Sequence, residues 1–268
     1  MLSARSAAVT NQLRRVSPPR LLLPWIVPVG ILIAWSAASA TRVISPQILP
    51  APRVVGETLL DLARTGDLWR NGVVSLGRIA AGFLLGCGVG LTFGTAMGLS
   101  RPIDDYLEPL WNALAQVPLL GWIPLFMMVL GIGESLKVVL LVIAVMVPVA
   151  VNTASGMKGV PAPFIEVART LRFSRLQLLR LVVLPAAVPA IFTGVRHGLT
   201  QAWLALVTVE LLASSEGLGF MIVWGRQLFQ LDLVLAAIAI VGLVGLGFDR
   251  GLALLETRLL PWRPEALR

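Results

Sequence analysis

The sequence predicts an all-α membrane protein with six transmembrane helices. Three features support this class: 57% of the 268 residues are hydrophobic, only 13% are charged, and the mean hydropathy is +0.85. Soluble domains are less apolar and carry about 25% charged residues. A spanning helix needs about 20 mostly apolar residues. The candidate spans lie near residues 21–40, 73–99, 108–131, 136–157, 187–212 and 231–256.

The first span has a second interpretation. Basic residues precede it, and Ala38, Ser39 and Ala40 resemble the small-residue cleavage site of a secretory signal peptide. Its apolar run is longer than the usual signal-peptide core of about 7–15 residues, which favours a retained anchor.

The distribution of Lys and Arg predicts that both termini are cytoplasmic. If the N-terminus lies inside, the inner segments carry about twice as many basic residues as the outer ones, as the positive-inside rule requires. The expected layout is a cytoplasmic segment at 1–20, a transmembrane domain at 21–256 and a cytoplasmic tail at 257–268.

The segment PRVVGETLLDLARTGDLW between the first two spans predicts a short amphipathic helix on the outer surface. Pro52 suits a first helical position, and apolar residues recur at Val55, Leu59 and Leu62. This helix either contacts an external partner or lies over the mouth of the helix bundle.

The second span carries a glycine at every fourth position from Gly82 to Gly98. Such a ladder leaves one helical face without side chains, so a second helix can approach closely. Packing is therefore the expected role. The stretches GCGVG and GLVGLG do not indicate a dinucleotide site, because no strand precedes them.

Several functional classes are excluded. The basic residues are spread over short segments between apolar runs, which argues against nucleic-acid binding. One cysteine, Cys87, and one histidine, His197, cannot form an ordinary zinc site. Neither of the two lysines, Lys137 and Lys158, follows a glycine as a phosphate-binding loop requires. No carboxylate pair or nucleophile with a base lies at membrane depth, so an intramembrane enzyme is not expected.

Two short helices are expected on the cytoplasmic side between the fourth and fifth spans. Pro161 and Pro163 suit a helix start, so a first helix should cover about 163–171. Ser174 followed by Gln177 is a capping box, so a second helix should begin there and run to about 183. Pro185 should end that helix or kink it into the next span.

This segment resembles the permease subunits of bacterial ATP-binding-cassette (ABC) importers. Their cytoplasmic signature is E-A-A, three residues, G, nine residues, then I-x-L-P. The residues that match are Glu166, Ala168, Leu184 and Pro185. Val167 and Val182 are mild apolar replacements, and Arg172 stands where the family usually has glycine.

Arg172 is the main departure from the signature. Glycine would permit a left-handed turn between the two helices, and another residue in that conformation costs about 1–2 kcal/mol. We therefore expect that the turn moves by one residue or that a contact holds Arg172.

The resemblance extends over about 24–262 and is greatest to the branch that imports nitrate, taurine and aliphatic sulfonates. The supporting stretches are ILPAPRVVGETLLDLARTGDLW, SLGRIAAGF, GLS, WIPLFMMVLGIGESLK and TGVRHGLTQAWLALVTVELLASSEGLGFMI. The resemblance implies the type I ABC importer permease fold in a bacterial inner membrane, and transport rather than enzymatic activity. A stand-alone secondary transporter or channel is the alternative.

The resemblance also implies partners. These are a second copy of the permease, two cytoplasmic ATPases and an external solute-binding protein. ATP and Mg²⁺ would be bound by the ATPases, and no cofactor is expected in this chain. Coupling to the ATPases would run through the 161–185 segment. Its expected contact residues are Glu166, Val167, Ala168, Arg169, Arg172, Arg175, Leu184 and Pro185.

Polar side chains inside the spans are candidates for the translocation pathway, because they are costly in a bilayer and tend to face a cavity or one another. They are Arg78, Gln116, Arg196, His197, Gln201 and Glu210. Arg196 and His197 lie toward an inner helix end, where snorkelling to the surface is an alternative. Pro118, Pro124 and Pro148 predict kinks within their spans.

Overall fold

Helices dominate the part of the chain that the computed structural model describes, residues 18–41 and 45–259, and no strand occurs among these residues. The all-α class is therefore confirmed. The expected cytoplasmic segments 1–20 and 257–268 lie mostly outside this part of the chain.

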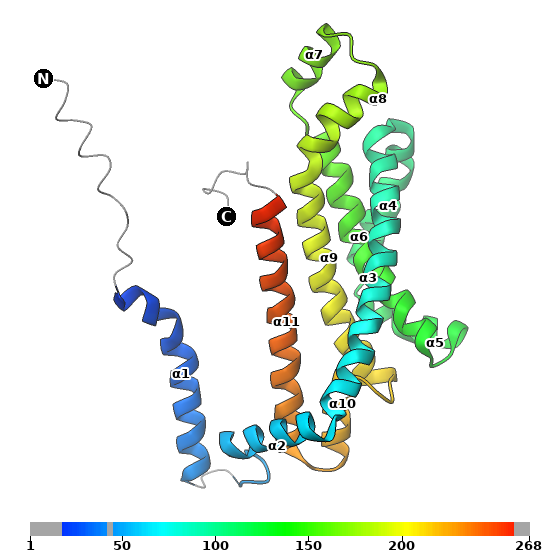
Figure 1. Ribbon diagram of the computed structural model, residues 1–268. Coiled ribbons are helices and arrows are strands. Elements are labelled where there is room, and N and C mark those ends of the chain that lie inside the picture. Colours follow the sequence, from blue (N-terminus) through cyan, green and yellow to red (C-terminus); the bar gives the residue numbers. More distant parts are fainter. Residues whose placement is uncertain (1–17, 42–44, 260–268) are drawn as a thin grey trace, which may run out of the picture.

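Within residues 18–41 and 45–259, four helices are long and apolar enough to cross a membrane. They are α3 (Asp67–Leu99), α6 (Glu134–Lys158), α9 (Leu184–Ala213) and α11 (Leu231–Leu259). Each covers one of the predicted spans, and together they form the bundle seen in Figure 1. The first predicted span is α1 (Pro18–Ala40), which stands apart from this bundle. Trp35 Nε1 of α1 donates a hydrogen bond to the Pro50 carbonyl oxygen at 3.0 Å.

The third predicted span is not one continuous helix, and the kink predicted at Pro118 is a full break. The chain forms α4 (Arg101–Gln116) and α5 (Leu119–Leu130), which meet at an angle of 98°. Pro118 lies in the break, where its ring and missing N–H interrupt the helical hydrogen bonds. Counting the bent pair as one span gives up to five spans among the described residues, beside the shorter apolar stretch of α1. Pro124 and Pro148, by contrast, lie inside helices that continue through them.

The glycine ladder of α3 packs directly on α6. A Cβ built on Gly86 would lie 2.6 Å from the Cβ of Val145, and one on Gly94 would lie 2.7 Å from that of Thr153. Only glycine permits such an approach, so the packing role predicted for the ladder is confirmed.

The two ends of the bundle differ. At one end, α2 (Pro52–Thr65) lies across the long helices beside the short helix α10 (Leu218–Gln227). Thr58 Oγ1 of α2 donates to Asp232 Oδ2 of α11 at 2.7 Å. The amphipathic helix is therefore present and lies over the end of the bundle; its contact with an external partner stays a prediction. The 161–185 segment projects from the opposite end (Figure 1).

Candidate functional site

The two short helices of the 161–185 segment form where the sequence predicts them. The first is α7 (Ala162–Thr170) and the second begins as α8 (Arg175–Leu178). The capping box is complete: the Gln177 backbone N–H donates to Ser174 Oγ at 3.3 Å, and the Ser174 backbone N–H donates to Gln177 Oε1 at 2.8 Å.

The second helix does not end near residue 183, contrary to one of the two outcomes predicted for Pro185. It continues through a π-helical turn, η1 (Leu179–Val183), directly into α9. Pro185 lies in the first turn of α9. A π turn next to a proline lets neighbouring groups satisfy the backbone carbonyl that lost its donor. The segment from α8 onward is therefore continuous with a membrane-spanning helix.

Arg172 occupies the left-handed turn itself. Its φ is 57°. The Phe173 N–H donates to the Ala168 carbonyl oxygen at 3.0 Å, and the Arg172 N–H donates to that of Arg169 at 2.9 Å. This pair of bonds is a Schellman motif, in which glycine is the usual left-handed residue. The turn has not moved, and backbone hydrogen bonds hold Arg172 where the family signature has glycine.

One face of α7 is apolar and exposed. Phe164, Val167 and Leu171 are 58%, 59% and 63% exposed, and their spacing places them on the same side of the helix. Ala168, in contrast, is buried, and α7 packs on η1 of the same chain. Glu166, Arg169 and Arg175 are exposed. The small side chain of Ala168 therefore permits close packing between α7 and η1 of the same chain.

A buried charge cluster lies at the α2 end of the bundle. Arg78 Nη1 donates to Glu210 Oε1 at 2.8 Å, and the two side chains are 3% and 0% exposed. Ser75 Oγ donates to the same carboxylate, and the backbone N–H of Gly219 donates to Glu210 Oε2 at 2.9 Å. Glu210 therefore accepts bonds from α3 and from the N-terminus of α10, where a negative charge is favourable.

The second half of this cluster comes from α6. Arg78 Nη2 lies 2.6 Å from Glu134 Oε1, and Lys137 Nζ lies 2.7 Å from the same oxygen. Arg78 Nη1 also donates to the backbone carbonyl oxygen of Glu216 at 2.8 Å. The Arg78 guanidinium thus connects α3, α6, α9 and the turn before α10.

Arg196 and His197 are neighbours in the sequence but face different elements. Arg196 Nη2 lies 2.6 Å from Asp249 Oδ1, and its Nη1 lies 3.3 Å from Glu256 Oε2, both on α11. His197 instead lines a cavity with Gln201, and their Nε2 atoms are 3.2 Å apart.

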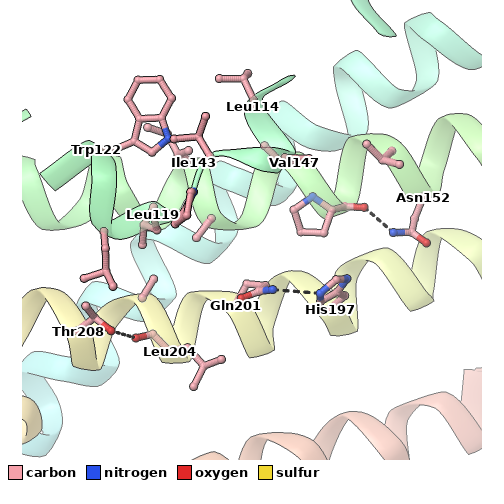
Figure 2. A pocket seen from close by; sticks show the side chains of 18 residues that line it. Leu114, Leu119, Trp122, Ile143, Val147, Asn152, His197, Gln201, Leu204 and Thr208 are labelled. Atoms are coloured by element: carbon pink, nitrogen blue, oxygen red, sulfur yellow. Dashed lines mark hydrogen bonds between the residues drawn. The ribbon is translucent and has the colours of Figure 1, made fainter. Parts of the chain in front are cut away.

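That cavity has a volume of about 500 Å³ and lies among α5, α6, α9 and the end of α4. Figure 2 shows its wall: Leu114, Leu119, Trp122, Ile143, Val147, Asn152, His197, Gln201, Leu204 and Thr208. His197, Gln201 and Thr208 come from the middle and the C-terminal half of α9, and Ile143, Val147 and Asn152 come from the middle and the C-terminal half of α6.

The candidate pathway residues therefore fall into separate groups. Arg78 and Glu210 contact each other in the buried cluster, Arg196 pairs with α11, and His197 and Gln201 share the cavity. Gln116 is exposed at the end of α4. Their role in transport stays a prediction. Sequence reasoning missed Glu134 and Lys137 as cluster members, although two charges three residues apart at the start of a span are a signal for such a pair.

Comparison with known proteins gives consistent matches. The family described as "Binding-protein-dependent transport system inner membrane component" matches residues 86–261. The chain is 39% identical to the putative aliphatic sulfonates transport permease protein SsuC of Bacillus subtilis (strain 168), over 93% of this chain and 92% of that protein. It is 37% identical to the taurine transport system permease protein TauC of Escherichia coli (strain K12), over 88% and 87%.

The fold also has a solved counterpart. A chain from the crystal structure of an amino acid ABC transporter with histidines superposes with a TM-score of 0.64, covering 75% of this chain and 97% of that one. The sequences are only 20% identical, so this match concerns the fold alone.

Proposed function

The chain belongs to the family of binding-protein-dependent transport system inner membrane components, and we propose that it is the permease of an importer for a small anionic solute. The first candidates are an aliphatic sulfonate or taurine, which the names of two relatives mention; nitrate comes next. Transport, rather than enzymatic activity, is the function of this family.

The observation that carries this proposal is the exposed apolar face of α7. The helix α7 lies at the end of the bundle opposite α2 (Figure 1), and the side chains of Phe164, Val167 and Leu171 are exposed there. Apolar side chains aligned on a short surface helix suit insertion into a groove of another protein. We assign this face to a cytoplasmic ATPase, with Glu166, Arg169 and Arg175 as flanking polar contacts.

The continuity of the segment supports transmission of force. Because α7 packs on η1, and α8, η1 and α9 form an uninterrupted helical run, a displacement of the docked α7 would pass through η1 to α9. The other proposed components are a second permease copy, two ATPases that bind ATP and Mg²⁺, and a solute-binding protein on the α2 side. Both termini would lie in the cytoplasm.

Co-purification tests this proposal against the alternative of a stand-alone transporter or channel. The chain is co-expressed with an ATPase partner, extracted in mild detergent and captured through a tag on the permease. A stoichiometric ATPase, and uptake of taurine or an alkanesulfonate that requires ATP and the binding protein, are the expected results. Transport by the purified chain alone, driven by an ion gradient, would contradict the proposal.

A further inference from the structure

The cavity among α5, α6 and α9 has no charged wall. Neither Asp, Glu, Lys nor Arg is found among the described residues that line it. This is unexpected for a protein proposed to move anions, because an isolated anion is costly to transfer into apolar surroundings.

The cationic side chains nearby in the sequence are engaged elsewhere. Arg196 precedes the cavity residue His197 but pairs with Asp249 of α11. Arg78 is held by Glu210 and Glu134 in the buried cluster. In this conformation, an anion in the cavity would meet the side chains of Gln201 and His197 rather than a lysine or arginine.

The polar groups of the wall differ in what they can still donate. Thr208 Oγ1 donates to the Leu204 carbonyl oxygen at 2.8 Å, so its hydroxyl is used within α9. Asn152 Nδ2 donates one N–H to the Pro148 carbonyl oxygen at 2.8 Å and keeps its second N–H. The Gln201 amide has two N–H groups, and its contact with His197 involves one of them. The side chains of Gln201 and His197 are both exposed.

The rest of the wall is apolar and bulky. It includes Leu119 and Trp122 of α5, Ile143 and Val147 of α6, and Leu204 of α9. Such a wall with a few polar groups is the usual composition of a site for an organic molecule, and a volume of about 500 Å³ lies in the usual range.

We infer that this cavity is a transit site for an alkyl-bearing anion and that it discriminates against inorganic anions. The head oxygens accept hydrogen bonds from Gln201 and His197, and the alkyl chain lies along the wall formed by Leu119, Trp122, Ile143 and Val147. This inference rests on the proposed function and refines it, because it selects organic sulfonates over nitrate within the permease itself.

The discrimination depends on how much binding free energy an alkanesulfonate and nitrate each gain from the apolar wall. Every methylene group removed from water strengthens binding by about fourfold, so a longer chain compensates for the incomplete hydration of its head group. Nitrate has no such group and loses hydration without a compensating charge. Gln201 is therefore a specificity-determining residue in this scheme.

Equilibrium binding to the purified chain in lipid nanodiscs tests the inference without the binding protein. The probe is radiolabelled hexanesulfonate, with butanesulfonate, ethanesulfonate and nitrate as competitors. We expect affinity to rise with chain length by about fourfold per methylene group. Nitrate lacks the alkyl chain, so it should compete at least about 100-fold more weakly than hexanesulfonate, which is less than the combined effect of about four methylene groups. Gln201→Leu should weaken hexanesulfonate binding by about tenfold or more, as expected for loss of a hydrogen bond to a charged group.

Two variants make the test specific. Val147→Asn should reduce the dependence on chain length, because it makes the wall polar. Thr200→Val is the matched control: Thr200 is an exposed neighbour of Gln201 whose hydroxyl donates to the Arg196 carbonyl oxygen, and it does not line the cavity. The Thr200→Val variant should bind hexanesulfonate with the same affinity as the unmodified chain.

The outcomes separate this inference from the proposed function. Absence of hexanesulfonate binding, equal competition by nitrate, or unchanged affinity of Gln201→Leu would each overturn the transit site. ATP-dependent uptake of an alkanesulfonate by the reconstituted importer is measured in parallel. Normal alkanesulfonate uptake that Gln201→Leu does not change removes only the transit site. Absence of ATP-dependent uptake of alkanesulfonate, taurine and nitrate removes the proposed function.

Discussion

Arg78 of α3 and Glu210 of α9 form a buried ion pair with Nη1 and Oε1 2.8 Å apart, although 132 positions separate them in the chain. Neither side chain is more than 3% exposed. Every short contact of the Glu210 carboxylate comes from a donor on another element, namely Ser75, Arg78 and Gly219. The pair therefore fixes the relative position of three helices at this end of the bundle.

Removal of one partner of this pair should strongly destabilise the fold. Arg78→Met leaves the Glu210 carboxylate buried without its cation, at a cost of about 3–5 kcal/mol. Thermal unfolding of the detergent-solubilised chain measures the loss. Arg53→Ala is the control, because the Arg53–Glu57 pair is exposed and should contribute less than about 1 kcal/mol. Equal melting temperatures for the two variants would contradict the role assigned to Arg78.

The glycine ladder should be sensitive to any side chain on its packed face. A Cβ at Gly90 would lie 2.8 Å from the Cβ of Val149 and 2.8 Å from the Met146 carbonyl oxygen, so Gly90→Val must separate α3 from α6. We expect loss of stability of about 1–3 kcal/mol or more from overpacking. Gly88→Ala, two positions away, meets nothing within 4 Å and should be neutral or slightly stabilising in the same unfolding measurement. Comparable destabilisation by both variants would count against the close packing of α3 on α6.

The joint at Arg172 should become more stable when glycine is restored. Arg172→Gly removes the cost of a left-handed non-glycine residue, about 1–2 kcal/mol, and should slow amide hydrogen exchange of Phe173, whose N–H closes the turn. Arg172→Val should have the opposite effect, since a β-branched residue is a severe outlier at positive φ. Faster exchange in Arg172→Gly would show that the Arg172 side chain itself holds the joint.

Ala168→Asp should abolish transport and stimulation of the ATPase while leaving membrane insertion intact. The new carboxylate would be placed at a buried position where α7 packs on η1, so α7 would be displaced from its docking orientation. Stimulated ATP hydrolysis in proteoliposomes is the readout. Ala162→Asp, at an exposed position at the start of the same helix, serves as the control and should retain activity. Unimpaired stimulation with Ala168→Asp would refute the coupling role.

Much of the local structure could be predicted from the sequence. The Ser174 capping box depends on backbone hydrogen bonds within a few residues, and the glycine ladder shows directly which face of the helix lacks side chains. At Arg172 the sequence left two outcomes open, and the structure decided that the left-handed turn stays in place. The bend at Pro118 was harder to predict. A proline in an apolar run is compatible with a mild kink or with a sharp break, and packing decides between them.

The sequence by itself determined the membrane class, most of the helices and the family signature, because apolar periodicity and capping are local properties of the chain. Only the tertiary structure decided that Arg78 contacts Glu210, that Arg196 turns to α11 while His197 faces a cavity, and that this cavity has no charged wall. These relationships join residues from different helices. They depend on how the helices rotate and pack against one another, which no single stretch of sequence specifies.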